Sequence, residues 1–338
     1  MPQALTAQTT GELSTLPGTS PAEAPKAVVE PESRTVPEAG SAPATAYAWM
    51  ALSATLFALM NFFARLASAK VPWTMVGATR ALVGVLVALA VGRLGGSALR
   101  VRDQRGMWLR SLLGTASMLC TFYALSRPAL PLGDTTTLLN LTPVFVALLT
   151  PFFLREPTGA RVVASLSISL AGVLLVLRPA ALFGGQVAAE GAVDVGLVAA
   201  LAAVFAAFAM MMLRRLGPRE SPAAISMHFS LVAAGTFALL SAPSLILPSE
   251  KDALHMILAG LCAGFAQIAM TRAYALERAA RVSAVGYLAV AVSGALGAAV
   301  LEEWPRGTTL LGMALVVGGG LVIALGARPS ASGLPSRR

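Results

Sequence analysis

The sequence predicts an all-α polytopic membrane protein with ten transmembrane helices, arranged as two inverted five-helix repeats. Three observations lead to this prediction. Hydrophobic residues make up 56% of the 338 residues and charged residues only 12%. Apolar runs of helical length recur along the chain, and its second half repeats short motifs of the first. Soluble domains carry about 25% charged residues, so the composition excludes an ordinary soluble domain.

The net charge of +9 does not indicate a nucleic-acid partner. The basic residues lie singly or in small groups between apolar runs, whereas nucleic-acid-binding proteins gather them on one face. Loops beside anionic membrane lipid show this scattered pattern. Residues 1–45 are rich in Pro, Ala, Ser and Glu, a composition that cannot offset the entropy of ordering. We expect a disordered cytoplasmic tail there.

Ten segments are apolar and long enough to cross a bilayer, which requires about 20 residues of helix. Since lipid offers no water to satisfy backbone groups, such segments form α-helices. The predicted spans are residues 46–66, 72–94, 107–126, 134–154, 161–178, 193–213, 223–247, 253–275, 282–301 and 307–326.

The distribution of Lys and Arg between alternate loops predicts the orientation. The side with both termini carries sixteen of these residues and the other side six, while Arg80, Arg110 and Arg272 lie within spans. Because basic loops stay in the cytoplasm, we expect both termini to be cytoplasmic. The predicted location is the plasma membrane, which in a bacterium is the inner membrane.

Short motifs recur along the chain at an offset of about 150 residues. The stretch "FARLASAKVPWT" (63–74) lies over "LRRLGPRESPAA" (213–224), and "LREP" (154–157) resembles "LEEW" (301–304). Each repeat holds five spans, an odd number, so the second copy enters the membrane in the opposite direction. Inverted repeats are typical of transporters, with the substrate site between them near the midplane. The resulting divisions are a first repeat at 46–180, a second repeat at 190–326 and a cytoplasmic tail at 327–338.

The motifs resemble those of EamA-type members of the drug/metabolite transporter superfamily. They are Arg80 in "ATRALVGVLVALA", "FYAL" closing the third span, and "TTLLNLTPVFVALL" followed by "LREP" in the fourth. The resemblance covers about residues 46–326 and implies a ten-helix bundle that exports or imports small metabolites through a central cavity. The second repeat departs from the pattern, because Ser230 stands in the place of Arg80 and no Asn matches Asn140. We therefore expect an asymmetric cavity.

The fourth span carries polar residues and prolines that hydrocarbon would not favour. Thr136, Asn140 and Pro143 share one helical face, and Pro143 cannot donate to the carbonyl of Leu139. We expect Pro143 to kink the helix, and Thr136 and Asn140 to line a hydrated, substrate-binding surface. Hydrogen bonding between helices is the alternative.

Two residues are candidates for proton coupling. Asp134, at the outer end of the fourth span, either caps the helix N-terminus or handles protons or cations. His228, in the middle of the seventh span, is either a hydrogen-bonded structural residue or a proton relay.

Arg80 is the main candidate for substrate binding. A charge about eight residues into a span is costly, and Arg80 shares a face with Gly77 and Gly84, which indicates contact with another helix. Arg80 either binds a substrate carboxylate or forms a structural lock with Asn61 or backbone carbonyls. The further substrate-binding candidates are Asn61, Gln267 and Tyr287.

Enzyme motifs are missing from the sequence. It has two His and two Cys and lacks H-E-x-x-H, G-x-x-x-x-G-K-[ST] and G-x-S-x-G, so we expect no catalytic residue, cofactor or metal. The expected function is secondary transport, gradient-driven or facilitated, of a small polar or amphipathic metabolite such as an amino acid. The resemblance favours export; an uptake permease, an intramembrane enzyme and a lipid scramblase are the alternatives. The expected partners are the metabolite and membrane lipid, and a homodimer stays open.

Overall fold

Every regular element of the described residues is helical. The structure, a computed structural model, describes residues 42–96, 99–154, 160–177, 190–216, 219–276, 282 and 285–326, and these ranges contain no strand. Contacts divide the chain into Met1–Pro37 and Glu38–Arg338, and all described residues belong to the second unit. The predicted tails, apart from residues 42–45, lie outside the described residues.

The helices follow most of the predicted spans. In the first half they are α1 (Ala42–Ser68), α2 (Trp73–Leu94), α3 (Gln104–Leu125), α4 (Leu132–Leu139), α5 (Thr142–Leu154) and α6 (Ala160–Leu177). In the second half they are α8 (Ala192–Leu216), α9 (Pro222–Ser241), the short 3₁₀ helix η1 (Ala242–Ser244), α10 (Glu250–Leu276), α12 (Leu288–Val300) and α13 (Gly307–Gly326). Side-chain oxygens accept from first-turn N–H groups at the starts of α3, α9 and α10, where the capping residues are Asp103, Ser221 and Ser249.

The outer faces of the long helices suit lipid. Among the described residues, five helical segments are long and apolar enough to cross a membrane: Ala44–Ser68, Trp73–Leu94, Ala192–Leu216, Pro222–Ser244 and Glu250–Leu276. Large apolar side chains on these segments are exposed, among them Leu82, Leu86, Leu197, Leu231 and Leu261. So many exposed apolar side chains would be unusual in water, and they agree with a multi-pass membrane protein.

The predicted fourth span is not one helix. α4 and α5 are separate helices, with residues 140 and 141 between them. Pro143 has no N–H to give to the Leu139 carbonyl, and the Thr142 hydroxyl donates to that carbonyl at 3.0 Å instead. The prediction of a single kinked helix over 134–154 was therefore wrong, because the chain supplies a side-chain donor that stabilises a complete break.

A second break lies in the predicted ninth span, residues 282–301. Gly286 and Tyr287 form a turn, and α12 begins only after them, at Leu288. The predicted seventh span also ends early, because α9 stops at Ser241 and η1 follows it. Helix breaks inside a membrane are tolerated where they are buried in protein or line a cavity.

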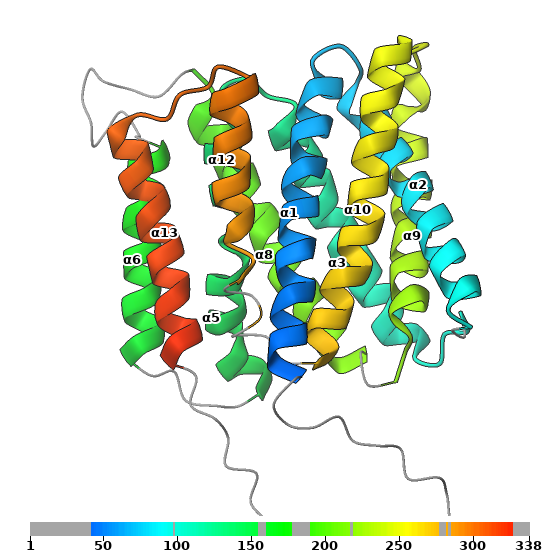
Figure 1. Cartoon of the computed structure of the whole chain (residues 1–338), viewed down its shortest axis with the longest axis horizontal. Helices are drawn as coiled ribbons and strands as arrows, with labels where there is room; N and C mark the ends of the chain where they lie inside the picture. Colours follow the sequence, from blue (N-terminus) through cyan, green and yellow to red (C-terminus); the bar gives the residue numbers. More distant parts are fainter. Residues whose placement is uncertain are drawn as a thin grey trace, which may run out of the picture. The chain divides into compact units, whose positions relative to one another are not determined.

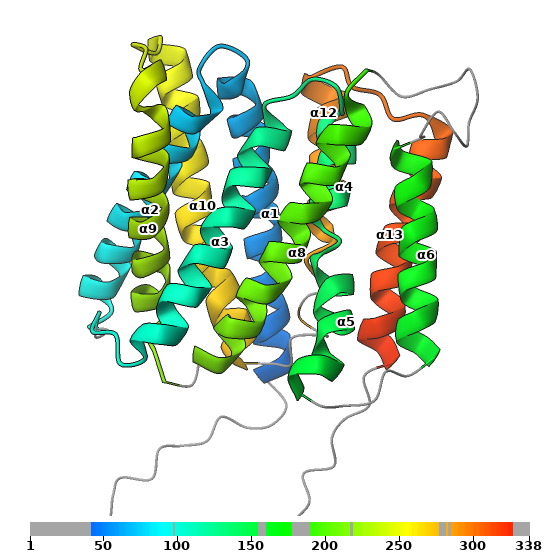
Figure 2. The same ribbon diagram turned by 180° about the vertical axis from the view of Figure 1, so that it is seen from behind.

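Helices from the two halves of the chain pack side by side. α1 lies against α10, α3 against α8, α2 against α9 and α6 against α13 (Figures 1 and 2). Hydrogen bonds join the first two pairs: Ser53 Oγ donates to the Ala266 carbonyl, and Ser117 Oγ donates to the Ala202 carbonyl, both at 2.9 Å. Such bonds between membrane helices are worth ~0.6–2 kcal/mol each.

The glycine face predicted for α2 is confirmed as a helix contact. A Cβ atom added at Gly77 would collide with the Phe237 ring, and one at Gly84 would come within 2.9 Å of Ser230 Oγ, both on α9. Glycine thus permits the close approach of these helices. The same face carries Arg80, which therefore points into the bundle.

One end of the bundle is tied together around Arg65, near the end of α1. Its guanidinium donates to three backbone carbonyls at and after the end of α3, at 2.8 to 3.2 Å. It also pairs with Glu303 Oε1 at 2.9 Å, while Glu303 Oε2 accepts from the Leu132 N–H at 2.6 Å. We refer to Arg65, Glu303 and Leu132 as the Arg65 latch.

The latch also corrects the reading of Asp134 as a helix cap. α4 begins at Leu132 with Pro131 before it, so Asp134 lies inside the first turn rather than at the N-cap. The acceptor at this helix N-terminus is Glu303, more than one hundred residues away in sequence. Local spacing could not have revealed such a cap.

Candidate functional site

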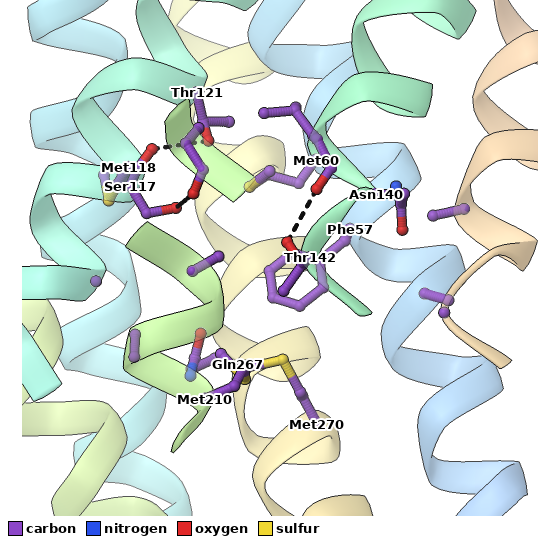
Figure 3. A pocket seen from close by; sticks show the side chains of 18 of the residues that line it. Phe57, Met60, Ser117, Met118, Thr121, Asn140, Thr142, Met210, Gln267 and Met270 are labelled. Atoms are coloured by element: carbon purple, nitrogen blue, oxygen red, sulfur yellow. Dashed lines mark hydrogen bonds between the residues drawn. The ribbon is translucent and has the colours of Figure 1, made fainter. Parts of the chain in front are cut away.

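A cavity of about 220 Å³ lies within the bundle. α1, α2, α3, α8 and α10 contribute to its walls, the two helix breaks contribute Asn140 and Gly286, and the start of α5 contributes Thr142. Figure 3 shows polar and thioether side chains from several of these helices gathered around this space. The sulfur-containing and aromatic lining residues are Met50, Phe57, Met60, Met118, Phe122, Met210, Met270 and Tyr274.

The cavity extends along the middle of the bundle. From α1 it is lined by residues 50–61, and from α3 by residues 110–122, in each case on both sides of the helix midpoint. Asn61 and Phe122 lie about one helical turn before Arg65 and before Leu125, whose carbonyl accepts from Arg65. The cavity therefore approaches the Arg65 latch, which lies near the last turn of α1.

Five predicted site residues line this one cavity: Asn61, Arg80, Asn140, Pro143 and Gln267. They come from α1, α2, the α4–α5 break, the start of α5, and α10. Asn61 Oδ1 and Gln267 Nε2 are buried and have no hydrogen-bond partner among the described residues. An unsatisfied buried amide costs free energy, so these two groups are suited to meet a ligand or water.

Thr136 and Tyr287 are not among the residues that line the cavity. Both are buried, and their hydroxyl groups lack a hydrogen-bond partner within the described ranges. The Thr136 carbonyl accepts from Asn140 Nδ2 at 2.9 Å, so it holds a lining side chain. Tyr287 follows Gly286, which does line the cavity.

Asp134 and His228 also lie away from the cavity lining. Asp134 is buried near the Arg65 latch, and its Oδ1 has no hydrogen-bond partner in the part of the chain that the structure describes. His228 Nδ1 lies 2.8 Å from Ser111 Oγ, and its ring packs edge-on against Trp108. The surroundings of His228 favour the structural alternative.

Arg80 is 5% exposed and makes few contacts that would satisfy a guanidinium. Its Nη1 donates to Met118 Sδ at 3.1 Å, and its Cζ lies 5.3 Å from the centroid of the Phe229 ring. A thioether is a weak acceptor, and Arg80 Nε has no partner among the described residues. Neither of the predicted locks, to Asn61 or to a backbone carbonyl, is found within those residues.

Arg110, on α3, is a second arginine in the same cavity. It is 1% exposed, and its Cζ lies 4.5 Å from the centroid of the same Phe229 ring. Its Nε and Nη1 lack partners among the described residues. Arg110 was not among the predicted site residues, because a basic side chain near a span end usually extends to the headgroups. A charge inside a predicted span was the signal that could have found it.

The lining suits an amphipathic solute with an acidic group. Among the described residues that line the cavity, Arg80 and Arg110 are charged and none is acidic. Methionine side chains provide an adaptable apolar wall, and the amides of Asn61 and Gln267 can orient polar groups. The described residues contain no group of three or more metal-ligating side chains.

Apolar helices around a cavity that holds buried polar groups are typical of a membrane transporter, and the comparisons with known proteins agree. The model of the EamA-like transporter family matches residues 44–178 and 195–325. Since these matches cover most of the chain, the protein belongs to the EamA-like transporter family. It is a transporter and not an enzyme.

Two relatives with stated cargo resemble most of the chain. The pseudopaline exporter CntI of Pseudomonas aeruginosa is 28% identical over 267 residues, which covers 79% of this chain and 91% of CntI. The riboflavin transporter of Vibrio cholerae is 28% identical over 278 residues, which covers 80% of this chain and 89% of that protein. A crystal structure also matches with a TM-score of 0.61 and 23% identity, over 85% of this chain and 99% of its own, and shows the shared fold.

Proposed function

We propose that the protein is a secondary exporter that carries a small polar or amphipathic metabolite across the bacterial inner membrane. Two inverted five-helix repeats, at residues 46–180 and 190–326, rock around the cavity and expose it to each side in turn. Asn61, Arg80, Asn140 and Gln267 contact the substrate. Thr136 and Tyr287 lie beside the cavity at the two helix breaks, where the Thr136 carbonyl holds the Asn140 side chain.

Helix pairing supports the inverted repeats. If α1, α2, α3 and α6 correspond to α8, α9, α10 and α13, exchanging the two sets turns the α1–α10 contact into the α8–α3 contact. The same exchange maps the α2–α9 and α6–α13 contacts onto themselves. The same exchange converts one of the two serine hydrogen bonds into the other. At the 150-residue offset, Ser53 corresponds to Ala202 within one position, and Ser117 corresponds to Ala266 within one position.

The main support for the proposal is the position of the two helix breaks. The 147-residue offset that relates Leu154 to Leu301 also relates Asn140 to Tyr287, so both breaks fall at the same place in their repeats. Both deliver residues to one cavity. Discontinuous helices at the repeat interface form the substrate site in many inverted-repeat carriers, and they leave backbone groups available where a polar solute must bind.

The proposed direction is export. The excess of basic residues predicts cytoplasmic termini, and with that orientation the Arg65 latch ties the outer end of the bundle. CntI, one of the relatives, is an exporter by name. Proton coupling, if present, acts through Asp134, a buried acid beside the latch.

A metabolite comparison tests the proposal. Cells producing the wild-type protein, Ala206→Trp or Leu201→Trp are compared for solutes retained and released, with protein amounts in the membrane fraction matched. Ala206 lines the cavity, whereas Leu201, on the same helix, is exposed on its outer face. We expect wild-type and Leu201→Trp cells to release the same solute, and Ala206→Trp cells to retain it because the indole fills the cavity.

The same comparison separates the alternatives. Accumulation of a solute in producing cells, instead of release, would identify an uptake permease. Release that is unchanged by Ala206→Trp would contradict transport through the cavity. Movement of a fluorescent lipid between the leaflets of vesicles containing the protein, unaffected by Ala206→Trp, would identify a scramblase.

A further inference from the structure

We infer that the cavity is an anion site built for a solute with two acidic groups, one bound by Arg80 and the other by Arg110. This inference rests on the proposed function, since it names the class of metabolite that the cavity carries. It adds Arg110 to the site and specifies the chemistry of the cargo.

The first observation is an imbalance of charge. The cavity holds two arginines from different helices, α2 and α3, each no more than 5% exposed. No carboxylate lines it among the described residues, and the ion pair found within those residues joins Arg65 and Glu303, which do not line the cavity. Buried charges in proteins are normally paired, and leaving a buried cation unpaired is strongly unfavourable. A bound anion would supply the missing charges.

The second observation is a set of unused donors. Arg80 Nε, Arg110 Nε and Arg110 Nη1 are buried and have no hydrogen-bond partner among the described residues. A guanidinium holds a carboxylate through two parallel N–H···O bonds. Two guanidinium groups with free N–H atoms can therefore hold two carboxylates, whereas an uncharged solute would leave most of these donors unused.

The third observation is that both guanidinium groups are positioned by one ring. Phe229, on α9, lies 5.3 Å from Arg80 Cζ and 4.5 Å from Arg110 Cζ, so the two cations lie no farther apart than the sum of these distances. Cation–π contact stabilises an arginine without consuming its in-plane donors. The ring thus fixes both groups and leaves their N–H edges available.

Gly114 completes the arrangement on α3. A Cβ atom added there would collide with Arg110 Nη1 and come within 2.9 Å of the Phe229 ring. Glycine one turn after Arg110 therefore makes room for the guanidinium against the ring. The remaining wall of methionines and phenylalanines accommodates an apolar body, so the cargo class is a small dicarboxylate or related dianion with an apolar portion.

Calorimetric titration of the full-length protein in neutral detergent tests this inference. The probes are glutarate, with two carboxylates, butyrate, with one, and sodium chloride at matched ionic strength. We expect glutarate to bind at least tenfold more tightly than butyrate, because a second charge-assisted pair is worth more than one factor of ten. Sodium chloride should produce no saturable heat at the same concentrations.

Single-arginine variants give the matched comparison. Arg80→Gln and Arg110→Gln should each lower glutarate affinity to that of butyrate, and the double variant should bind neither. Arg80→Lys and Arg110→Lys keep the charge and should recover part of the glutarate preference. Arg272→Gln is the control: it removes one positive charge from an exposed residue that stacks on Trp49 outside the cavity, and it should bind like the wild type.

Two results would overturn the inference. Equal affinity for glutarate and butyrate in the wild type would show that a second acidic group adds no binding affinity. Glutarate binding that survives in the folded double variant would place the anion elsewhere. If either occurs while Ala206→Trp still abolishes solute release in cells, the proposed transport function stands and the dianion inference alone fails.

Discussion

Arg65 and the pair Arg80 and Arg110 are arginines of the same bundle, and their surroundings differ sharply. Arg65 donates to three backbone carbonyls and pairs with Glu303. The cavity arginines have a thioether, one shared aromatic ring and unused N–H groups among the described residues. An arginine satisfied by its own chain holds the fold together, whereas one left unsatisfied in a cavity is available to a ligand.

The largest effect is expected from Arg110→Gln. Removing one partner of a buried charge pair costs about 2–5 kcal/mol, and every 1.4 kcal/mol is about tenfold. Release of the solute identified in cells should fall by about 30-fold or more in proteoliposomes, at unchanged thermal stability. Arg272→Gln should transport normally. A large loss of thermal stability in Arg110→Gln would mean that this arginine is structural, like Arg65. The distinction between Arg65 and the cavity arginines would then be wrong.

The complementary change is Arg65→Gln, which should act on stability. It leaves Glu303 without its cation, and because both side chains are partly exposed we expect a cost of ~1–3 kcal/mol. The apparent midpoint of thermal unfolding in detergent should fall by about 5 °C, while glutarate affinity stays within a factor of two. The exposed Arg306→Gln at the same end is the control. Loss of glutarate binding without loss of stability would contradict the division of roles.

A smaller effect is expected from Gly114→Ala. The added methyl displaces the Arg110 guanidinium from Phe229, because a Cβ there has no room. Glutarate affinity should fall by roughly three- to tenfold, less than for deletion of the charge. The double variant with Arg110→Gln should be no worse than Arg110→Gln alone. Additive losses would show that Gly114 acts independently of Arg110.

The subtlest change is Asp134→Asn, at the latch end. If Asp134 couples transport to protons, this variant should lose the acceleration that an imposed pH gradient gives to the wild type in proteoliposomes. Flux without a gradient, and thermal stability, should remain close to wild type, because the amide nearly conserves shape. Retained dependence on the gradient would remove Asp134 from the coupling mechanism.

The sequence predicted the helices well because their signals are local. Apolar runs set their lengths, and Pro72 and Ser221 mark the starts of α2 and α9. The prolines also located the disturbance in the fourth span. They could not distinguish a kink from a break, because the outcome depends on a hydrogen bond from Thr142 to the Leu139 carbonyl.

The candidate site was predicted in part, for a similar reason. Asn61, Arg80, Asn140 and Gln267 were identified as polar groups at helix positions where lipid contact would be costly, and all four line the cavity. Arg110 was missed because its direction depends on Phe229 from another helix. The partner of Glu303 at the start of α4 depends in the same way on contacts between distant segments, which periodicity does not reveal.

The most direct test of the central claim is an experimental structure of the full-length protein determined with glutarate. The account predicts density for the ligand in the cavity, with one carboxylate at the Arg80 guanidinium and the other at Arg110. An empty cavity under saturating glutarate, or arginine donors occupied by groups of the protein itself, would contradict it.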